Sequence, residues 1–245
     1  MGGPPEPSHG TVAGPVGTDP RERTRDALLI GLTLAAGVVD AVSYLGLGQI
    51  FTANMTGNVV FLALAVGQRR LLTAVRSLAA LAAFCVGAVV AGRLLQRPRP
   101  AGLWPPRVTA VLGGSLACMA TFAGVWAVVR GSPGDRLVYL LIGLSSLGMG
   151  MQNAVARHLA VPGLTTTVIT TALTGFMVDL PALGVRGPAQ RRGGIAVLAL
   201  FSGAAIGAAL MVYLRVIAPF ATVAAIGAVT ILAYWVFSRA HGSHA

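Results

Sequence analysis

Eight stretches of this sequence are each long and apolar enough to cross a lipid bilayer as a helix. A transmembrane helix needs about 20 mostly apolar residues. Hydrophobic residues make up 55% of the chain and charged residues only 10%, and the mean hydropathy is +0.77, far outside ordinary globular usage. We therefore expect an all-α fold, a polytopic transmembrane helix bundle. The expected segments are Ala27–Leu47, Ile50–Gly67, Thr73–Leu95, Val108–Val129, Leu137–Ala156, Leu164–Leu183, Gly194–Leu214 and Val216–Phe237.

The basic residues predict an orientation. All 18 are arginines, scattered over the short loops between segments rather than gathered on one helix face, so they do not indicate nucleic-acid binding. By the positive-inside rule, eight crossings with a cytoplasmic N-terminus place twelve arginines inside and six outside. Six crossings place the same numbers on each side. We therefore expect both termini in the cytoplasm, whichever count is right.

The sequence divides into two similar halves. Shifting it by 113 residues places Thr33, Gly37 and Asp40 over Ser146, Gly150 and Asn153, and Thr52 and Thr56 fall on Thr166 and Thr170 at a shift of 114. The expected organisation is a two-fold internal repeat between two tails. The Pro/Gly-rich N-terminal tail is too polar and irregular to fold. The expected units are residues 1–25 (tail), 26–130 (first repeat), 131–238 (second repeat) and 239–245 (tail).

Each half contains a polar segment after its first helix. The first half has "FTANMTGNVV", residues 51–60, and the second has "LTTTVITTALTG", residues 164–175. Polar groups and irregular backbone in a membrane are tolerated where they pack inside the bundle or line a hydrated cavity. Matched interrupted segments in two halves indicate a transporter's binding site. If both segments are re-entrant, six crossings remain and the halves are inverted. If both cross, which we favour because each is long enough, the halves are parallel.

Asp40 is the strongest functional candidate, because a carboxylate in the middle of a span costs about 2.5 to 3.5 kcal/mol on the mildest scale. The alternative for Asp40 is a buried neutral carboxyl hydrogen-bonded to Asn54 or Thr56. The alternative for the amides and hydroxyls is that they only hold helices together, at about 0.6 kcal/mol per hydrogen bond. The candidate residues for substrate binding or coupling are Asp40, Asn54, Thr56, Asn58, Gln152, Asn153, Thr167 and Thr170.

The sequence carries no recognisable catalytic pattern. It has no HExxH or GxSxG motif and no two carboxylates close together in one span. Cys85 and Cys118 lie in apolar segments without CxxC spacing, so we expect neither a disulfide nor a metal site. We predict no enzymatic activity, no metal and no cofactor, and the oligomeric state is left open.

The stretch "GVVDAVSYL" (residues 37–45) followed by "FTANMTGNVV" resembles the signature of the YoaK-type bacterial membrane proteins, a domain of unknown function. The resemblance covers nearly the whole chain after the N-terminal tail. It implies a multi-pass protein of the bacterial inner membrane and carries no substrate or reaction with it.

The residues favour a secondary transporter or permease for a small solute, with Asp40 as a candidate carrier of a coupling proton. The chain has no ATP-binding loop that would suggest another energy source. The alternative is a non-transporting membrane bundle with a partner-binding or structural role.

Overall fold

The computed structural model describes residues 19–96, 103–159 and 188–238, and within these ranges the chain forms seven helices and no strand. The all-helical membrane fold is thus confirmed, and six of the helices are long and apolar enough to span a bilayer. The sixth expected segment, with the candidates Thr167 and Thr170, lies outside the described residues. The helices are α1 (Pro20–Gly46), α2 (Met55–Gly67), α3 (Leu71–Leu95), α4 (Pro106–Val128), α5 (Asp135–Leu159), α7 (Pro188–Tyr213) and α8 (Ala218–Ser238).

Helix α1 begins at Pro20, seven residues before the expected Ala27. The side chain of Asp19 caps the helix by accepting the N–H of Arg21 at 2.8 Å, and proline at the first helical position has no N–H that needs a partner. This Asp-Pro signal adds two polar turns ahead of the apolar window. The helix therefore extends beyond the part that hydropathy identifies.

Helix α2 is shorter than a helix that spans the bilayer core. Its 13 residues span about 20 Å, against a hydrocarbon core of about 30 Å. The expected segment began at Ile50, but residues 50–54 are not helical. The count of eight crossing helices is therefore not confirmed, and for this segment the short helix matches the re-entrant alternative.

Two pairs of helices pack side by side in parallel. In the first pair, Gly37 of α1 lies against the backbone of Leu200 in α7, and Gly203 of α7 lies against the backbone of Leu34 in α1. A Cβ on Gly37 would lie 2.3 Å from the Leu200 carbonyl oxygen, so only glycine permits this approach. Arg192 and Asp26, joined at 2.7 Å, pair the N-terminal ends of the same two helices.

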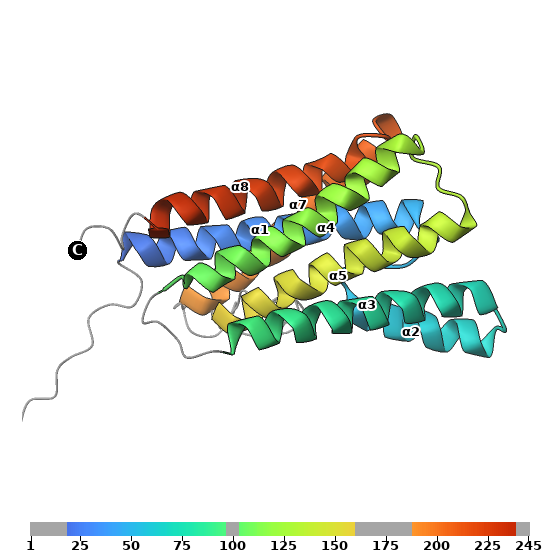
Figure 1. The fold of residues 1–245 in the computed structure, drawn as a ribbon, viewed down its shortest axis with the longest axis horizontal. Coiled ribbons are helices and arrows are strands. Elements are labelled where there is room, and N and C mark those ends of the chain that lie inside the picture. The colour runs from blue at the N-terminus through green and yellow to red at the C-terminus, as the bar shows by residue number, and fades with distance from the viewer. Residues whose placement is uncertain (1–18, 97–102, 160–187, 239–245) are drawn as a thin grey trace, which may run out of the picture.

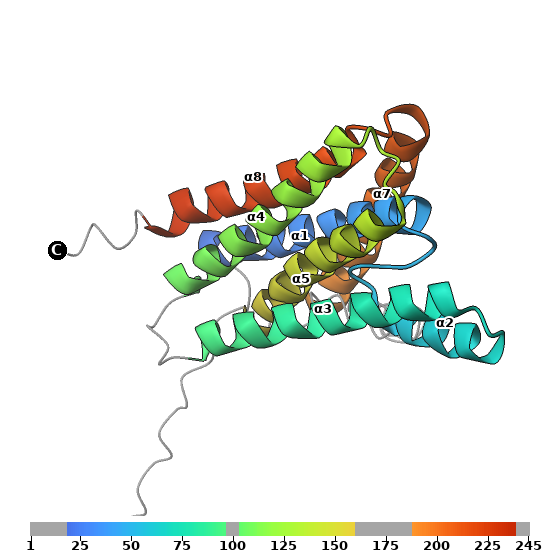
Figure 2. The same ribbon diagram turned by 45° about the vertical axis from the view of Figure 1, so that its right-hand side comes forward.

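The second parallel pair, α3 and α5, has the same construction. Gly150 of α5 lies against the backbone of Phe84, and Gly87 of α3 lies against the backbone of Leu147. A Cβ on Gly150 would lie 2.2 Å from the Phe84 carbonyl oxygen. Near the N-terminal ends of these helices, Arg76 Nη2 lies 3.8 Å from Asp135 Oδ1. This pair runs in the opposite direction to α1 and α7 (Figures 1 and 2).

Helices α1 and α5 form the centre of the bundle (Figure 1). In their most apolar windows 67% and 61% of residues are buried, against 22% in α3 and 28% in both α7 and α8. The outer helices expose large aliphatic and aromatic side chains, as a lipid-facing surface requires. The two central helices are also those that carry Asp40 and Gln152.

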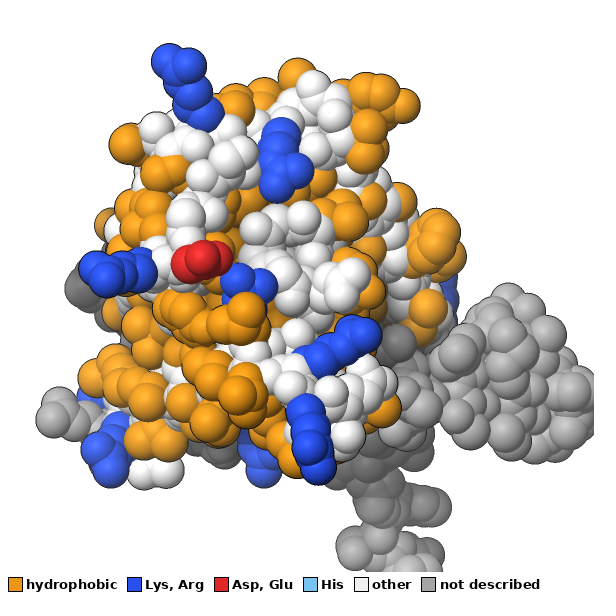
Figure 3. All heavy atoms as spheres, turned by 90° about the vertical axis from the view of Figure 1, so that its right-hand side faces the viewer, with side chains coloured by type: hydrophobic (Ala, Val, Ile, Leu, Met, Phe, Trp, Pro, Cys, Tyr) orange, Lys and Arg blue, Asp and Glu red, His pale blue; other side chains and the backbone are white. Residues whose placement is uncertain are grey.

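Arginines gather at the end of the bundle where α1 and α4 finish. Figure 3 shows this end, with an acidic side chain among the basic ones. Asp135 is the one acidic residue there in the described part of the chain. The opposite end carries the start of α1 and the finish of α8 (Figure 1). The basic residues at the first end are Arg69, Arg70, Arg76, Arg130, Arg136 and Arg215.

Candidate functional site

After α1 the chain turns back into the bundle through residues 47–54, here called the re-entrant segment. Gly48 and Gln49 make the turn with φ of 94° and 60°, a region that glycine adopts without strain. A Cβ on Gly48 would also lie 2.2 Å from Arg76 Nη1. Backbone geometry and the neighbouring arginine therefore both favour glycine at this position.

Asp40 holds the re-entrant segment in place. Its Oδ1 accepts the backbone N–H groups of Thr52 at 3.0 Å, Ala53 at 2.8 Å and Asn54 at 3.3 Å. These groups immediately precede α2, where a helix presents unpaired N–H groups and a positive dipole end. Asp40 lies six residues before the end of α1, which is about 9 Å along the helix axis. The tip of the segment thus lies beside the interior of α1, about 9 Å from the C-terminal end of that helix.

Asn54 at the end of the segment and Asn58 in α2 stabilise the shape of the segment. Asn58 is fully buried, and its side chain accepts the N–H of Phe51 at 2.9 Å and donates to the carbonyl oxygen of the same residue. Asn54 caps α2 by accepting the N–H of Gly57 at 3.4 Å. Thr56 is exposed on the first turn of α2. The Asn58 amide thus uses both its oxygen and its nitrogen on Phe51, and the Asn54 oxygen is used as the cap of α2.

A buried hydroxyl pair joins the segment to α5. Ser145 Oγ donates to Thr52 Oγ1 at 2.8 Å, and both residues are fully buried. Because Thr52 also donates its N–H to Asp40, the tip of the segment is tied to both central helices.

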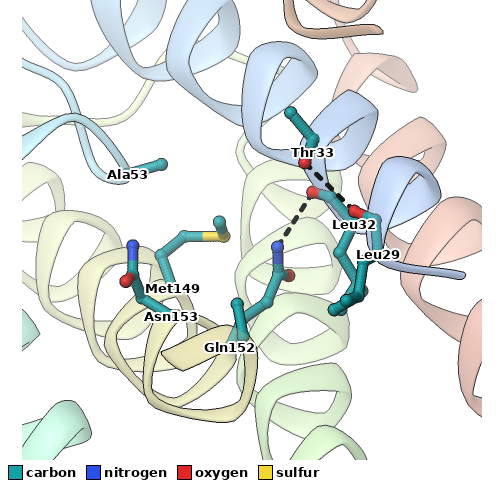
Figure 4. Close-up of a pocket in the computed structure, with 8 residues that line it drawn as sticks. Leu29, Leu32, Thr33, Ala53, Met149, Gln152 and Asn153 are labelled. Carbon is teal, nitrogen blue, oxygen red and sulfur yellow. Dashed lines mark hydrogen bonds between the residues drawn. The ribbon is translucent and has the colours of Figure 1, made fainter. Parts of the chain in front are cut away.

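A small cavity of about 10 Å³ lies beside this tip, between α1 and α5. That is roughly the space of one water molecule. Figure 4 shows Gln152 reaching from α5 toward α1, where its Nε2 donates to the Leu32 carbonyl oxygen at 2.9 Å. Across from it, Thr33 donates its hydroxyl to the Leu29 carbonyl oxygen at 3.0 Å. The lining residues are Leu29, Leu32, Thr33, Ala53, Met149, Gln152, Asn153 and Ala156.

The structure separates the predicted site residues into two groups. Gln152 and Asn153 line the cavity, whereas Asp40 and Asn58 position the re-entrant segment. Sequence reasoning missed Thr33 and Ser145 as site residues. Thr33 stood out only as a member of the repeat, and nothing in the sequence pairs Ser145 with Thr52.

Comparison with known proteins identifies the family. Residues 28–234 match the family described as "Protein of unknown function (DUF1275)". The chain belongs to this family. It is also 38% identical to the "UPF0700 transmembrane protein YoaK" of Bacillus subtilis (strain 168) over 156 residues, which cover 64% of this chain and 67% of that protein. No solved structure matches the chain significantly. The predicted resemblance is thus confirmed, and with six apolar helices the protein is a multi-pass membrane protein.

Proposed function

We propose that this protein is a secondary transporter or permease for a small solute. The observation that carries the proposal is the re-entrant segment, whose non-helical backbone lies inside a bundle of membrane-spanning helices and beside a partly polar cavity. Irregular backbone at membrane depth is tolerated only where it is buried in protein or lines a hydrated path. Broken helices at the meeting of two repeats are where transporters bind their substrates.

The paired helices support an inverted two-fold repeat. The close contact of Gly37 with Leu200 in α1 and α7 has its counterpart in that of Gly150 with Phe84 in α5 and α3. The sequence offsets are 113 residues for the glycines and 116 for their partners. Each helix pair also has an ion pair, formed by Arg76 in one and Arg192 in the other. These two arginines are 116 positions apart in the sequence. Because the two pairs run in opposite directions, this repeat is the inverted kind found in many transporters.

In this proposal Asp40 has two roles. It anchors the re-entrant segment, and it is the candidate carrier of a coupling proton. All three of its backbone hydrogen bonds use Oδ1. A proton on Oδ2 therefore leaves the anchor intact, so protonation can change the charge beside the cavity without releasing the segment.

Cysteine labelling tests the orientation. With six crossings and a cytoplasmic N-terminus, the turns at Gln68 and Gly131 both face outward. Single cysteines at these positions, in a protein whose Cys85 and Cys118 are replaced by alanine, should react with an impermeant thiol reagent added to intact cells. Labelling of both only from the cytoplasmic side would restore the eight-crossing arrangement.

Access to the cavity tests transport itself. In the same background, Thr33→Cys and Ala53→Cys should react with a small uncharged, water-soluble thiol reagent, because a thiol ionises and reacts where water reaches it. The matched control is Ser115→Cys, since Ser115 is fully buried between α4 and α5 and bonded to the Gly148 carbonyl oxygen. Two inert cavity cysteines in the folded protein would contradict the proposal and leave the non-transporting bundle.

A further inference from the structure

We infer, on the basis of the proposed transport function, that the cavity between α1 and α5 binds a small uncharged solute by accepting a hydrogen bond from it at Gln152 Oε1. The inference concerns the class of substrate. It rests on three features of the cavity: an unpaired acceptor on α5, a second acceptor on α1, and the absence of formal charge among the described lining residues.

Gln152 supplies the unpaired acceptor. Gln152 is only 3% exposed, and its Nε2 donates to the Leu32 carbonyl oxygen. A carbonyl oxygen can only accept, so this bond determines the orientation of the amide and leaves Oε1 as the other atom. Oε1 is buried and has no hydrogen-bond partner among the described residues. Buried polar groups are normally paired, so this oxygen is suited to a donor that arrives with a ligand.

Thr33 supplies the second acceptor from the facing helix. Its hydroxyl hydrogen goes to the Leu29 carbonyl oxygen, so the oxygen can offer only lone pairs to the cavity. Acceptors from both α1 and α5 therefore belong to residues that line the cavity (Figure 4). A pure acceptor, such as a carboxylate, finds no complementary group at either position.

The remaining lining makes an ion a poor occupant. Leu29, Leu32, Met149 and Ala156 give apolar walls, and no described lining residue carries a charge. An ion in the cavity loses its hydration without meeting a counter-charge in the described lining. A hydroxyl or uncharged N–H group on a short carbon skeleton fits both the acceptors and the walls. The cavity volume of about 10 Å³ accommodates one such group.

Thermal unfolding in detergent tests the inference with defined probes. The uncharged probes are glycerol, ethylene glycol, urea and acetamide, and the charged ones are sodium acetate and methylammonium chloride. A ligand that binds only the folded state raises the unfolding midpoint in a saturable way. We expect such a rise with at least one uncharged probe and with neither charged probe.

The decisive variant is Gln152→Leu, which replaces the whole amide, and with it the acceptor, by an apolar group of similar size. We expect it to weaken the apparent affinity about tenfold, the effect of one lost hydrogen bond near the upper end of its usual range. General solvent effects of the probes act on both proteins alike and cancel in the comparison. Ser146→Ala is the matched control, because it removes a buried hydroxyl from the same helix outside the cavity lining.

If Gln152→Leu does not fold, Thr33→Val takes its place, since it removes the second acceptor at nearly constant volume. The inference is overturned if no uncharged probe gives a saturable rise, if only a charged probe does, or if the rise is unchanged in the folded variant. Should that happen while cysteines at Thr33 and Ala53 react with the thiol reagent, transport survives and the substrate class is wrong. Inert cysteines remove the transport proposal itself.

Discussion

The re-entrant segment and the cavity beside it use the same kinds of polar side chain in opposite ways. Asp40 and Asn58 pair with backbone groups of the segment that would otherwise be unsatisfied in the membrane. In the cavity, Gln152 uses its donor and leaves its acceptor unpaired among the described residues. The difference teaches that an amide in a membrane span indicates a binding site only when part of its hydrogen-bonding capacity is unused.

Asp40 should give the largest loss of stability. Asp40→Ala leaves three backbone N–H groups without their acceptor, and each buried unsatisfied group costs about 1 to 3 kcal/mol. We expect a loss of about 3 kcal/mol or more, measured by denaturant titration in mixed micelles.

The control for this variant is Asp40→Asn, which keeps the acceptor and removes the charge. It should retain most of the stability and lose coupled solute movement. An Asp40→Ala protein as stable as the parent would show that the segment does not depend on its anchor, and the contrast between the two regions would fail.

Asn58 comes second. Asn58→Ala removes both side-chain hydrogen bonds to Phe51 and should lower the free energy of unfolding by about 1 to 3 kcal/mol. Thr56→Ala, two residues away on the exposed side of α2, should change it by less than about 0.5 kcal/mol. If the two variants had equal effects on the free energy of unfolding, Asn58 would not stabilise the segment.

Ser145 should have a smaller effect. Ser145→Ala leaves the Thr52 hydroxyl without the donor from α5 but preserves the three bonds to Asp40. The expected loss is about 1 kcal/mol, that of one ordinary hydrogen bond. Hydrogen exchange at the backbone amides of residues 52–54 measures it locally, since a looser tip opens more often. Unchanged exchange rates at these amides would show that the hydrogen bond to α5 does not stabilise the segment.

The sequence was sufficient to predict the class of fold, because hydropathy and length identify the six long helices directly. It also identified Asp40, since a carboxylate in an apolar window stands out. The role of Asp40 could not be predicted, because its partners are backbone groups 12 to 14 residues later. Such bonds leave no pattern in side-chain types.

The length of the second segment was wrong for a related reason. Hydropathy counts Ile50 to Asn54 toward a span, but it cannot detect that Asp40 and Asn58 satisfy this backbone outside a helix. The cavity could not be predicted from the sequence either, because its position depends on the register of α5 against α1. That register places Gln152 at Leu32.

Gln152 should give the smallest loss of stability and the clearest loss of function. Gln152→Leu removes one hydrogen bond to Leu32, and it also removes a buried acceptor that lacks a described partner. These contributions oppose each other, because replacing an incompletely paired polar group by an apolar one of similar size can be neutral. We expect the free energy of unfolding to change by less than about 1 kcal/mol, with the response to uncharged probes reduced. A loss as large as that of Asn58→Ala would make Gln152 a structural amide like those of the segment. A stable Gln152→Leu protein that no longer responds to the probe would instead place the binding group in the cavity.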